Sequence, residues 1–504
     1  MKRKIHLGHL AIFGCLSTIG VSTLHADFFQ DLFNDFKTKR VLLISVDGMH
    51  SLDLANYIAS NPNSTLALLT QNGYNYTNAA STKPSDSIPG TAGYVTGGTP
   101  AVTGMYYDDA YNRKWSPPGS ACATVGAVVD LKQGIDKFPT LLDSGGIDPA
   151  KLPLDPSKGC TPVYPHNMLR VNTIFEVIKA TRQRTAYSEK RPAYDFLNGP
   201  SGIGVDDLYV PEIAFDNTLT DNLKTKNFDE LRVVSILNQI KGKDHTGTVT
   251  AVVPAIFGMN FQIINAAKKN VPGAYTDSLS TPSVTMTDAL NYVDNSLGRM
   301  VTELKNKNLF NSTAIIITAK HGETALDPSR RQIVLTSVIP AIVNGVQAGL
   351  AAKITQKANA YIWLTDQTKT AAVVAALTQP SNQSLAGIGQ VLSGASLKLL
   401  FPDPLLDPAV PDIVVVANTG VNYEPSFSST VLAEHGGFGE NDTHVPLLVA
   451  IPGVGKKTVT VPVQTIQIAP TILGLLRISP QKLEAVRLQG TDVLPLISFL
   501  PWVD

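Results

Sequence analysis

Residues 40–48 have the sequence RVLLISVDG, and this stretch decides the fold class. The apolar, β-branched run Arg40–Val46 is typical of a strand that is buried on both faces of a parallel sheet. Three further runs have the same character: NSTAIIIT at 311–318, DIVVVA at 412–417 and HVPLLVAI at 444–451. Residues 286–305 carry apolar residues at helical spacing between such runs. Strands that alternate with helices predict an α/β fold with a doubly wound, mainly parallel sheet.

The composition fits a large folded chain. Of the 504 residues, 43% are hydrophobic and 16% are charged, which supplies a sizeable core and excludes a disordered chain. Lys+Arg and Asp+Glu both number 41. Because a balanced charge gives no basic field, we expect no binding to a nucleic-acid polymer.

Residues 1–26 are predicted to be a secretory signal peptide. Lys2, Arg3 and Lys4 form a positive start, residues 10–24 are largely apolar, and Ala26 ends a plausible cleavage site. The alternative is a membrane anchor, but the apolar stretch is short for a span. We therefore expect a mature chain of residues 27–504, exported to the periplasm or secreted, with no membrane span.

Two cysteines, Cys122 and Cys160, remain once the signal is removed. An even pair in an exported chain favours one disulfide. The alternative is two free, buried thiols.

Two stretches have the character of insertions that form a cap over the main domain. Residues 105 to about 235 are rich in Pro, Gly, Tyr and Asp, with short irregular patterns. Residues from about 327 to 411 contain their own strand–helix pattern and are predicted to form a small α/β lobe.

Polar residues that directly follow the predicted strands are the candidates for chemistry, because ligands of open α/β sheets bind beyond the carboxyl ends of the strands. Asp47 follows the first strand. Ser87 precedes Pro89, which suits the first turn of a helix, so Ser87 is either a capping residue or a nucleophile at a positive helix end. Asp47 by itself is equally typical of a turn.

Four histidines stand in settings that suit metal ligands, and one of them is His444, which lies with Asp442 at the entry of the last predicted strand. His245 follows Asp244, His321 follows a predicted buried strand, and His435 lies in the segment Glu434–Gly437. Each alone is more typical of a structural or surface histidine, but together they favour a site. Imidazole and carboxylate ligands with few thiols favour zinc, with manganese or magnesium as alternatives.

The order of these motifs resembles that of the alkaline phosphatase superfamily, and most closely its type I phosphodiesterase/nucleotide pyrophosphatase branch. The resemblance runs along most of residues 40–475. It rests on five segments: VLLISVDGMH, SDSIPGTAGYVTGGTPAVTGMYYDD, ITAKHGE, AEHGGFGENDTHVPLLVAIPG and IQIAPTILGLL. The nucleophile of the family falls on Ser87.

The resemblance implies two metal ions about 4 Å apart and a covalent phosphoryl- or nucleotidyl-serine intermediate. Asp47, Ser87 and His321 fall at one metal. Candidates for the other are Asp244, His245 and His435.

The sequence departs from the family pattern at two places. The family usually has Asp where Lys320 stands, so this metal is held weakly or Lys320 itself contacts the phosphate, and one or two metals are expected. The family also separates its other Asp and His by several residues, whereas Asp244 and His245 are adjacent. Asn260 or Gln262 are alternatives there, with Asp442 and His444 in reserve.

The resemblance thus implies an exported, metal-dependent hydrolase of phosphodiesters or phosphate monoesters. Its substrate is expected to be a small phosphate ester or nucleotide, with Ser87 and Lys320 as catalytic residues. One alternative is a protein of this fold that has lost catalysis and keeps a binding role, which Lys320 motivates. Another is a sulfatase or phosphonate hydrolase, although no clear sulfatase modification motif is present.

Overall fold

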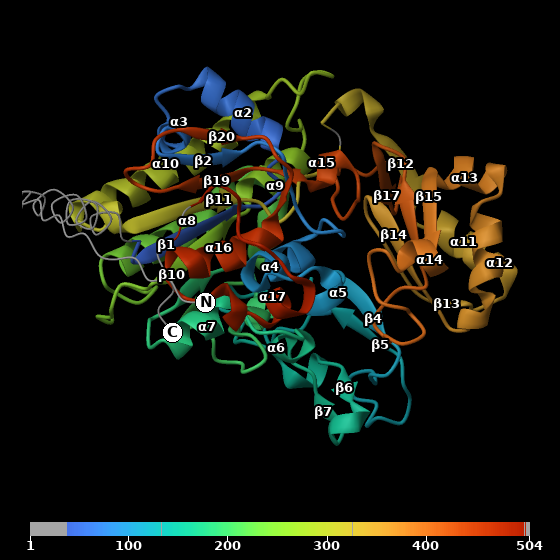
Figure 1. Ribbon diagram of the computed structural model, residues 1–504. Coiled ribbons are helices and arrows are strands. Elements are labelled where there is room, and N and C mark those ends of the chain that lie inside the picture. Colours follow the sequence, from blue (N-terminus) through green and yellow to red (C-terminus); the bar gives the residue numbers. More distant parts are fainter. Residues whose placement is uncertain (1–37, 133, 325, 498, 500–504) are drawn as a thin grey trace, which may run out of the picture. The chain divides into compact units, whose positions relative to one another are not determined.

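The computed structural model describes residues 38–132, 134–324, 326–497 and 499. The predicted signal peptide lies outside these residues. The main element is an eight-stranded sheet (Figure 1). Its strands are, in spatial order, β20 (Lys457–Val459), β2 (Gly73–Tyr76), β19 (Leu447–Ala450), β11 (Thr313–Thr318), β1 (Arg40–Val46), β10 (Ile256–Phe261), β8 (Ala186–Ser188) and β9 (Asp207–Tyr209).

The sheet is parallel from β11 to β9. Strand β1 pairs in parallel with β10 on one side and with β11 on the other, and β8 and β9 continue the parallel order beyond β10. Strand β19 instead runs antiparallel to β11, so the apolar run at 444–451 does not extend the parallel part. The run at 412–417 forms β16 (Ile413–Ala417), which belongs to a different sheet.

Both faces of the sheet are covered, as a buried strand requires. Along β1, Leu42 and Ile44 pack into a cluster with one set of helices, whereas Val41 and Leu43 pack into a cluster on the opposite face. The first set is α2 (Ser51–Ser60), α3 (Thr65–Thr70), α8 (Asn222–Ile240), α9 (Ile263–Lys269) and α10 (Val284–Asn306). The second is α4 (Ser87–Thr96), α7 (Ile174–Ala180), α16 (Ile468–Leu475) and α17 (Glu484–Gln489). The predicted doubly wound α/β fold is confirmed.

Helix α10 shows how local sequence fixes one of these elements. Ser283 caps its start by accepting a hydrogen bond from the backbone of Met286. Its apolar residues fall on one buried face, and the predicted helix at 286–305 is present with slightly longer ends. Among the described residues, no helix has the length and apolar character that a membrane span needs.

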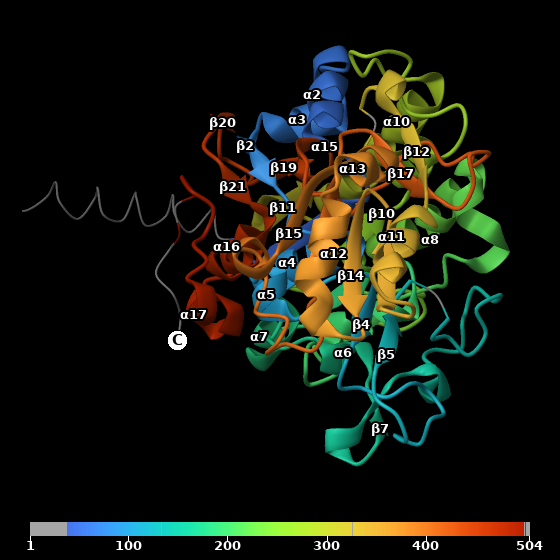
Figure 2. The same cartoon turned by 90° about the vertical axis from the view of Figure 1, so that its right-hand side faces the viewer.

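The apolar run at 412–417 belongs to a lobe with its own core. Its four-stranded antiparallel sheet has the order β13 (Ala351–Gln356), β14 (Asn359–Leu364), β16 and β15 (Ile388–Ser393). Helices α11 (Val338–Val346), α12 (Thr370–Leu377) and α13 (Pro380–Ala386) accompany it, and Figure 2 shows α11 and α12 on the side of this sheet that faces the viewer. Strand β12 (Gln332–Leu335) pairs with β17 (Val421–Glu424), so the lobe extends past residue 411.

The stretch from 105 to 235 is more than an insertion. It contains the hairpins of β4 (Asp109–Asn112) with β5 (Ala127–Asp130) and of β6 (Leu154–Asp155) with β7 (Thr161–Pro162). It also supplies β8, β9, α7 and most of α8 to the main sheet and its covering layers. Strands β8 and β9 have only three residues each, too few for a periodic signal, and β8 is placed by pairing with β10 and β9 by pairing with β8.

The predicted disulfide between Cys122 and Cys160 is present, with the two Cα atoms 5.9 Å apart. It closes a sequence separation of 38 residues that contains β5 and β6. A covalent bond here restricts the unfolded chain, because the ends of this loop can no longer separate.

Replacing both cysteines by serine is expected to lower the free energy of unfolding by about 4 kcal/mol on the chain-entropy model. Urea unfolding of the oxidised wild type, the reduced wild type and the double variant measures this effect. The reduced wild type is the matched control, and its urea midpoint should equal that of the double variant. Equal midpoints for oxidised and reduced protein would contradict the prediction.

Candidate active site

The carboxyl ends of four parallel strands deliver polar side chains to one edge of the main sheet. The side chains are those of Asp47 after β1, Lys190 after β8, Gln262 after β10 and Lys320 after β11. Because β1 pairs in parallel with β10 and β11, and β10 with β8, these strand ends lie together. The turn after β1 is tight, since Gly48 has a φ of +79°.

Ser87 is brought to this edge by helix α4. The N-cap is Asp86, so Ser87 is the first helical residue and not the cap. Gly90 lies one turn further, and a Cβ at this position would be 2.3 Å from the carbonyl oxygen of Lys320. The glycine is therefore needed for the helix start to lie against the chain that follows β11.

The hydroxyl of Ser87 has two polar neighbours. Its Oγ is 3.2 Å from Nε2 of His321 and 3.1 Å from Nζ of Lys190. Nδ1 of His321 faces the carbonyl oxygen of Gly322 at 2.7 Å, which orients the ring. Ser87 is thus held between an imidazole and an ammonium group at a helix start, where the helix dipole favours negative charge.

Asp47 is fully buried and is surrounded by cations. Its Oδ2 is 2.6 Å from Nζ of Lys190 and 3.6 Å from Nζ of Lys320. Its Oδ1 is 2.6 Å from Nε2 of His321, and Asn260 donates to Oδ2 at 3.4 Å. Burial by itself raises the pKa of Asp47, but the charges of Lys190, Lys320 and His321 hold that pKa well below its usual range.

Lys320 is also completely buried. Its Nζ pairs with Glu189 at 2.6 Å and donates to the Tyr194 hydroxyl at 2.8 Å. The same nitrogen lies 4.5 Å from the centre of the Tyr194 ring. Lys320 therefore contacts an acid and an aromatic ring, and it points to Asp47 without touching Ser87.

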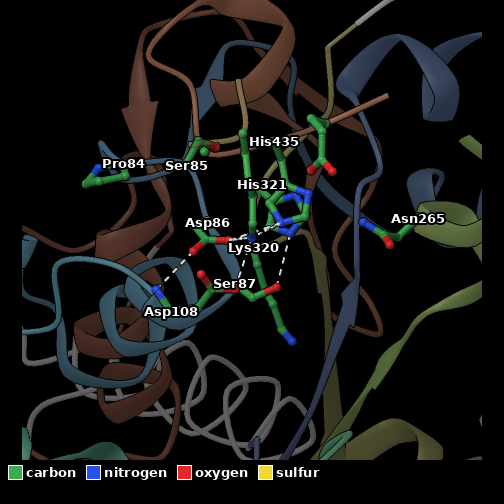
Figure 3. Close-up of polar contacts among 12 residues, drawn as sticks. Pro84, Ser85, Asp86, Ser87, Asp108, Asn265, Lys320, His321 and His435 are labelled. Carbon is green, nitrogen blue, oxygen red and sulfur yellow. Dashed lines mark hydrogen bonds and ion pairs between the residues drawn. The ribbon is translucent and has the colours of Figure 1, made fainter. Parts of the chain in front are cut away.

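The rings of His321 and His435 stack, with centroids 3.8 Å apart and planes inclined by 16° (Figure 3). Nε2 of His435 is 3.1 Å from Asp86, and its Nδ1 is 3.1 Å from Glu323. Burial and the neighbouring His321 and lysine charges lower the pKa of His435 well below its usual range, so this ring is neutral. Burial raises the pKa of Glu323 to about 8.

Asp86, His321 and His435 are a candidate metal-binding group. Their ligand atoms all lie within 4.8 Å of one another, and all three residues are buried. The contact from Glu323 to Nδ1 of His435 is the arrangement that orients a metal-ligating histidine. The donor set of one carboxylate and two imidazoles fits one divalent cation of the zinc type.

A cavity of about 180 Å³ opens over Ser87. Its lining is strongly cationic: Lys132, Lys190, Arg191, Lys269 and Lys357, with Asp108 as the acid among its lining residues. Lys357 pairs with Asp108 at 3.0 Å and approaches Asp86 at 3.5 Å. A pocket of this charge suits an anion such as a phosphate ester.

The structure does not bring Asp244 and His245, the predicted partners of His435 at a metal, to the group of Asp86, His321 and His435. They lie in the loop between α8 and β10, at the amino end of β10, whereas Gln262 and Asp47 follow the carboxyl ends of their strands. His245 is paired with Asp207 at 2.6 Å and its ring stacks on Tyr209. In the described part of the chain, the metal-binding group does not include either residue.

The four alternative ligands have different places. Gln262 accepts from Lys190 at 3.1 Å, and Asn260 contacts Asp47, so both belong to the site. Asp442 accepts from the backbone of Gly437 at 3.1 Å. His444 lies 2.9 Å from the Thr77 carbonyl oxygen, and neither Asp442 nor His444 is part of the group around Asp86.

Sequence reasoning missed Lys190, Glu189 and Asp86. Asp86 was adjacent to Ser87 and could have been found as the residue that precedes the helix. Lys190 and Glu189 follow a strand of only three residues, which leaves no periodic signal. Glu323, two residues after His321, was visible in the sequence but had no predicted role.

A family model for type I phosphodiesterase / nucleotide pyrophosphatase matches residues 41–438. The chain belongs to this family. The phosphodiesterase family is one of phosphoric ester hydrolases, within the alkaline phosphatase superfamily, as the order of motifs predicted. No curated protein sequence matches the chain significantly.

Solved structures of the same fold include a phosphodiesterase and an alkaline phosphatase. Murine ectonucleotide pyrophosphatase / phosphodiesterase 5 is 16% identical, with a TM-score of 0.56, and the match covers 88% of this chain and 96% of that one. An inactive variant of the murine protein in complex with AMP matches equally well. Wild-type alkaline phosphatase PafA is 12% identical, with a TM-score of 0.57 and coverage of 88% and 96%. At these identities the likeness concerns the fold alone.

Proposed function

We propose that this phosphodiesterase-family chain hydrolyses small phosphate esters, in particular nucleotide phosphodiesters or monoesters, with Ser87 as the nucleophile. The observation that carries the proposal is the position of Ser87 Oγ, 3.1 Å from the Lys190 ammonium at the floor of a cationic cavity. The AMP complex of the murine relative supports a nucleotide as the substrate.

The reaction forms a covalent intermediate on Ser87 and then hydrolyses it. The bond between Ser87 Oγ and phosphorus forms while the bond from phosphorus to the leaving oxygen breaks. The hydroxyl proton passes to solvent water, and the leaving oxygen takes a proton from the same source. Lys190 stabilises the negative charge on Oγ, and the cavity lysines hold the phosphoryl oxygens. Water then attacks phosphorus and releases Ser87.

We propose that Asp86, His321 and His435 bind a divalent cation, with zinc as the first candidate. When bound, such an ion supplies Lewis-acid stabilisation of phosphoryl oxygens. Glu323 orients His435 for this task, and Lys357 balances the charge of Asp86.

Export to the periplasm or to the medium is part of the proposal. The Cys122–Cys160 disulfide favours an oxidising compartment, where such bonds persist. Export is measured by antibody detection of the processed chain in the cytoplasmic, periplasmic and medium fractions. Retention of an unprocessed chain in the cytoplasm would contradict it.

A binding protein without catalysis is the second candidate, because two buried lysines approach Asp47 from the side where the family resemblance implies a metal. Assays with bis-nitrophenyl and mono-nitrophenyl phosphate, with added Zn²⁺ or Mn²⁺, separate the two functions. We expect turnover, and mass spectrometry of acid-quenched protein should find a phosphoryl or ester adduct on the peptide that contains Ser87. No turnover of either ester favours the binding protein.

A further inference from the structure

The Lys190 ammonium group occupies a position that resembles that of a bound cation. Its Nζ lies 2.6 Å from Asp47 Oδ2, 3.1 Å from Ser87 Oγ and 3.1 Å from Gln262 Oε1. These oxygens come from the ends of β1 and β10 and from the start of α4. An ammonium group has three donors and no acceptor, so the three oxygens satisfy it fully.

The family resemblance implies a metal ion beside Asp47, Ser87 and His321, but these residues do not fit one. Two ligands of a tetrahedral zinc ion, each about 2.1 Å from the metal, lie roughly 3.4 Å apart. Asp47 Oδ1 and His321 Nε2 are only 2.6 Å apart, which is a direct ion-pair distance.

Lys320 makes the surroundings of Asp47 still less suited to a metal. Lys320 stands where the family usually has a carboxylate, and its Nζ is 3.6 Å from Asp47. Lys320 offers no lone pair while it is charged, and it remains paired with Glu189 at 2.6 Å. A divalent cation would therefore lie beside two buried ammonium groups, with repulsion that the low dielectric of the interior strengthens.

We propose that Lys190 and Lys320 replace a metal ion beside the carboxylate of Asp47. The chain therefore binds no more than one divalent cation, at Asp86, His321 and His435. Lys190 contacts the reacting oxygen and is a catalytic residue, whereas Lys320 acts through Asp47 and Glu189 as a positioning residue. The catalytic part of this inference rests on the proposed function, but the metal count does not.

The metal count tests the replacement directly. Wild-type protein is equilibrated with excess Zn²⁺, separated from free metal by gel filtration, and analysed for zinc per chain. We expect no more than one, and two per chain would overturn the proposal. This measurement uses the folded wild type and does not depend on turnover.

The variant Lys190→Met/Lys320→Asp removes one ammonium group and restores a carboxylate beside Asp47. We expect it to bind one more zinc ion per chain than the wild type and to melt at a higher temperature when zinc is added. The matched control is Lys268→Met, which also removes a buried lysine paired with an aspartate, here Asp53 at 2.8 Å. The control should bind as much zinc as the wild type. A folded double variant that gains no zinc would refute the role of the lysines, and if it does not fold, Lys320→Asp alone is measured by the same criterion.

The catalytic role of Lys190 is tested by steady-state kinetics on a nitrophenyl phosphate ester. Lys190→Met should lower kcat by about 10²-fold or more with a smaller change in KM, because the charge acts on the oxygen of the transition state. Lys190→Arg keeps the charge and should restore part of kcat. Wild-type kcat in Lys190→Met would overturn this role, and a wild type without turnover would refute the proposed function while leaving the metal count intact.

Discussion

Ser87→Ala is expected to lower kcat/KM for phosphate-ester hydrolysis by about 10³-fold or more, because it removes the proposed attacking oxygen. The other groups of the site remain in place. Lys190 keeps its contacts with Asp47 and Gln262, and His321 keeps its contact with Gly322. The variant should therefore still fold and bind the substrate.

Steady-state assays on the two nitrophenyl esters measure this loss, and circular dichroism checks the fold. The matched control is Ser85→Ala, two residues earlier, whose hydroxyl bonds to Ser81 at 2.6 Å and donates to the carbonyl oxygen of Asp442, outside the group around Ser87. The control should keep most of its activity. If Ser87→Ala hydrolyses the esters as fast as the wild type does, Ser87 is not the nucleophile.

Asp47→Asn is expected to lower the free energy of unfolding by about 3–5 kcal/mol, the range for breaking a buried ion pair from one side. Asparagine has nearly the same shape, so the effect is electrostatic. Lys190 lies 2.6 Å and Lys320 lies 3.6 Å from the Asp47 carboxylate, and both lysines lose this negative partner in the variant. Because the folded pKa of Asp47 lies below its usual range, the stabilisation is complete at neutral pH and is lost as the pH falls through that pKa.

Urea unfolding at neutral pH measures the loss. The double variant Asp47→Asn/Lys190→Met removes the uncompensated ammonium as well, and it should recover part of the stability. Asp492→Asn is the control at an exposed aspartate near the carboxyl end of the chain and should unfold near the wild-type midpoint. An unchanged midpoint in Asp47→Asn would show that the carboxylate is not the centre of this charge network.

The local sequence determined much of the fold and part of the site. The run at 40–46 forms β1 and the run at 311–318 forms β11, because continuous β-branched stretches suit a strand that is buried on both faces. Asp47, Lys320 and His321 follow these strands and Ser87 begins α4, so each lies within three residues of a strong local signal. The disulfide was also predictable, from two cysteines in a chain with a signal-like start.

The position of Lys190 was decided by the tertiary structure alone. Strand β8 has three residues, and it lies in the sheet because it pairs with β10, far along the sequence. This pairing carries Glu189 and Lys190 to the same edge as Asp47. A stretch rich in Gly and Pro therefore supplied the cation that contacts Ser87.

The positions of Asp244 and His245, apart from His435, have the same origin. Their residue types suit a metal site, but chemistry in a parallel sheet depends on which end of the strand a residue occupies. They precede β10, whereas Gln262 follows it. Residue types and apolar runs thus determined the family, the strands and the candidate Ser87, and strand pairing decided which charges surround Ser87, because side chains distant in sequence meet only when the sheet is formed.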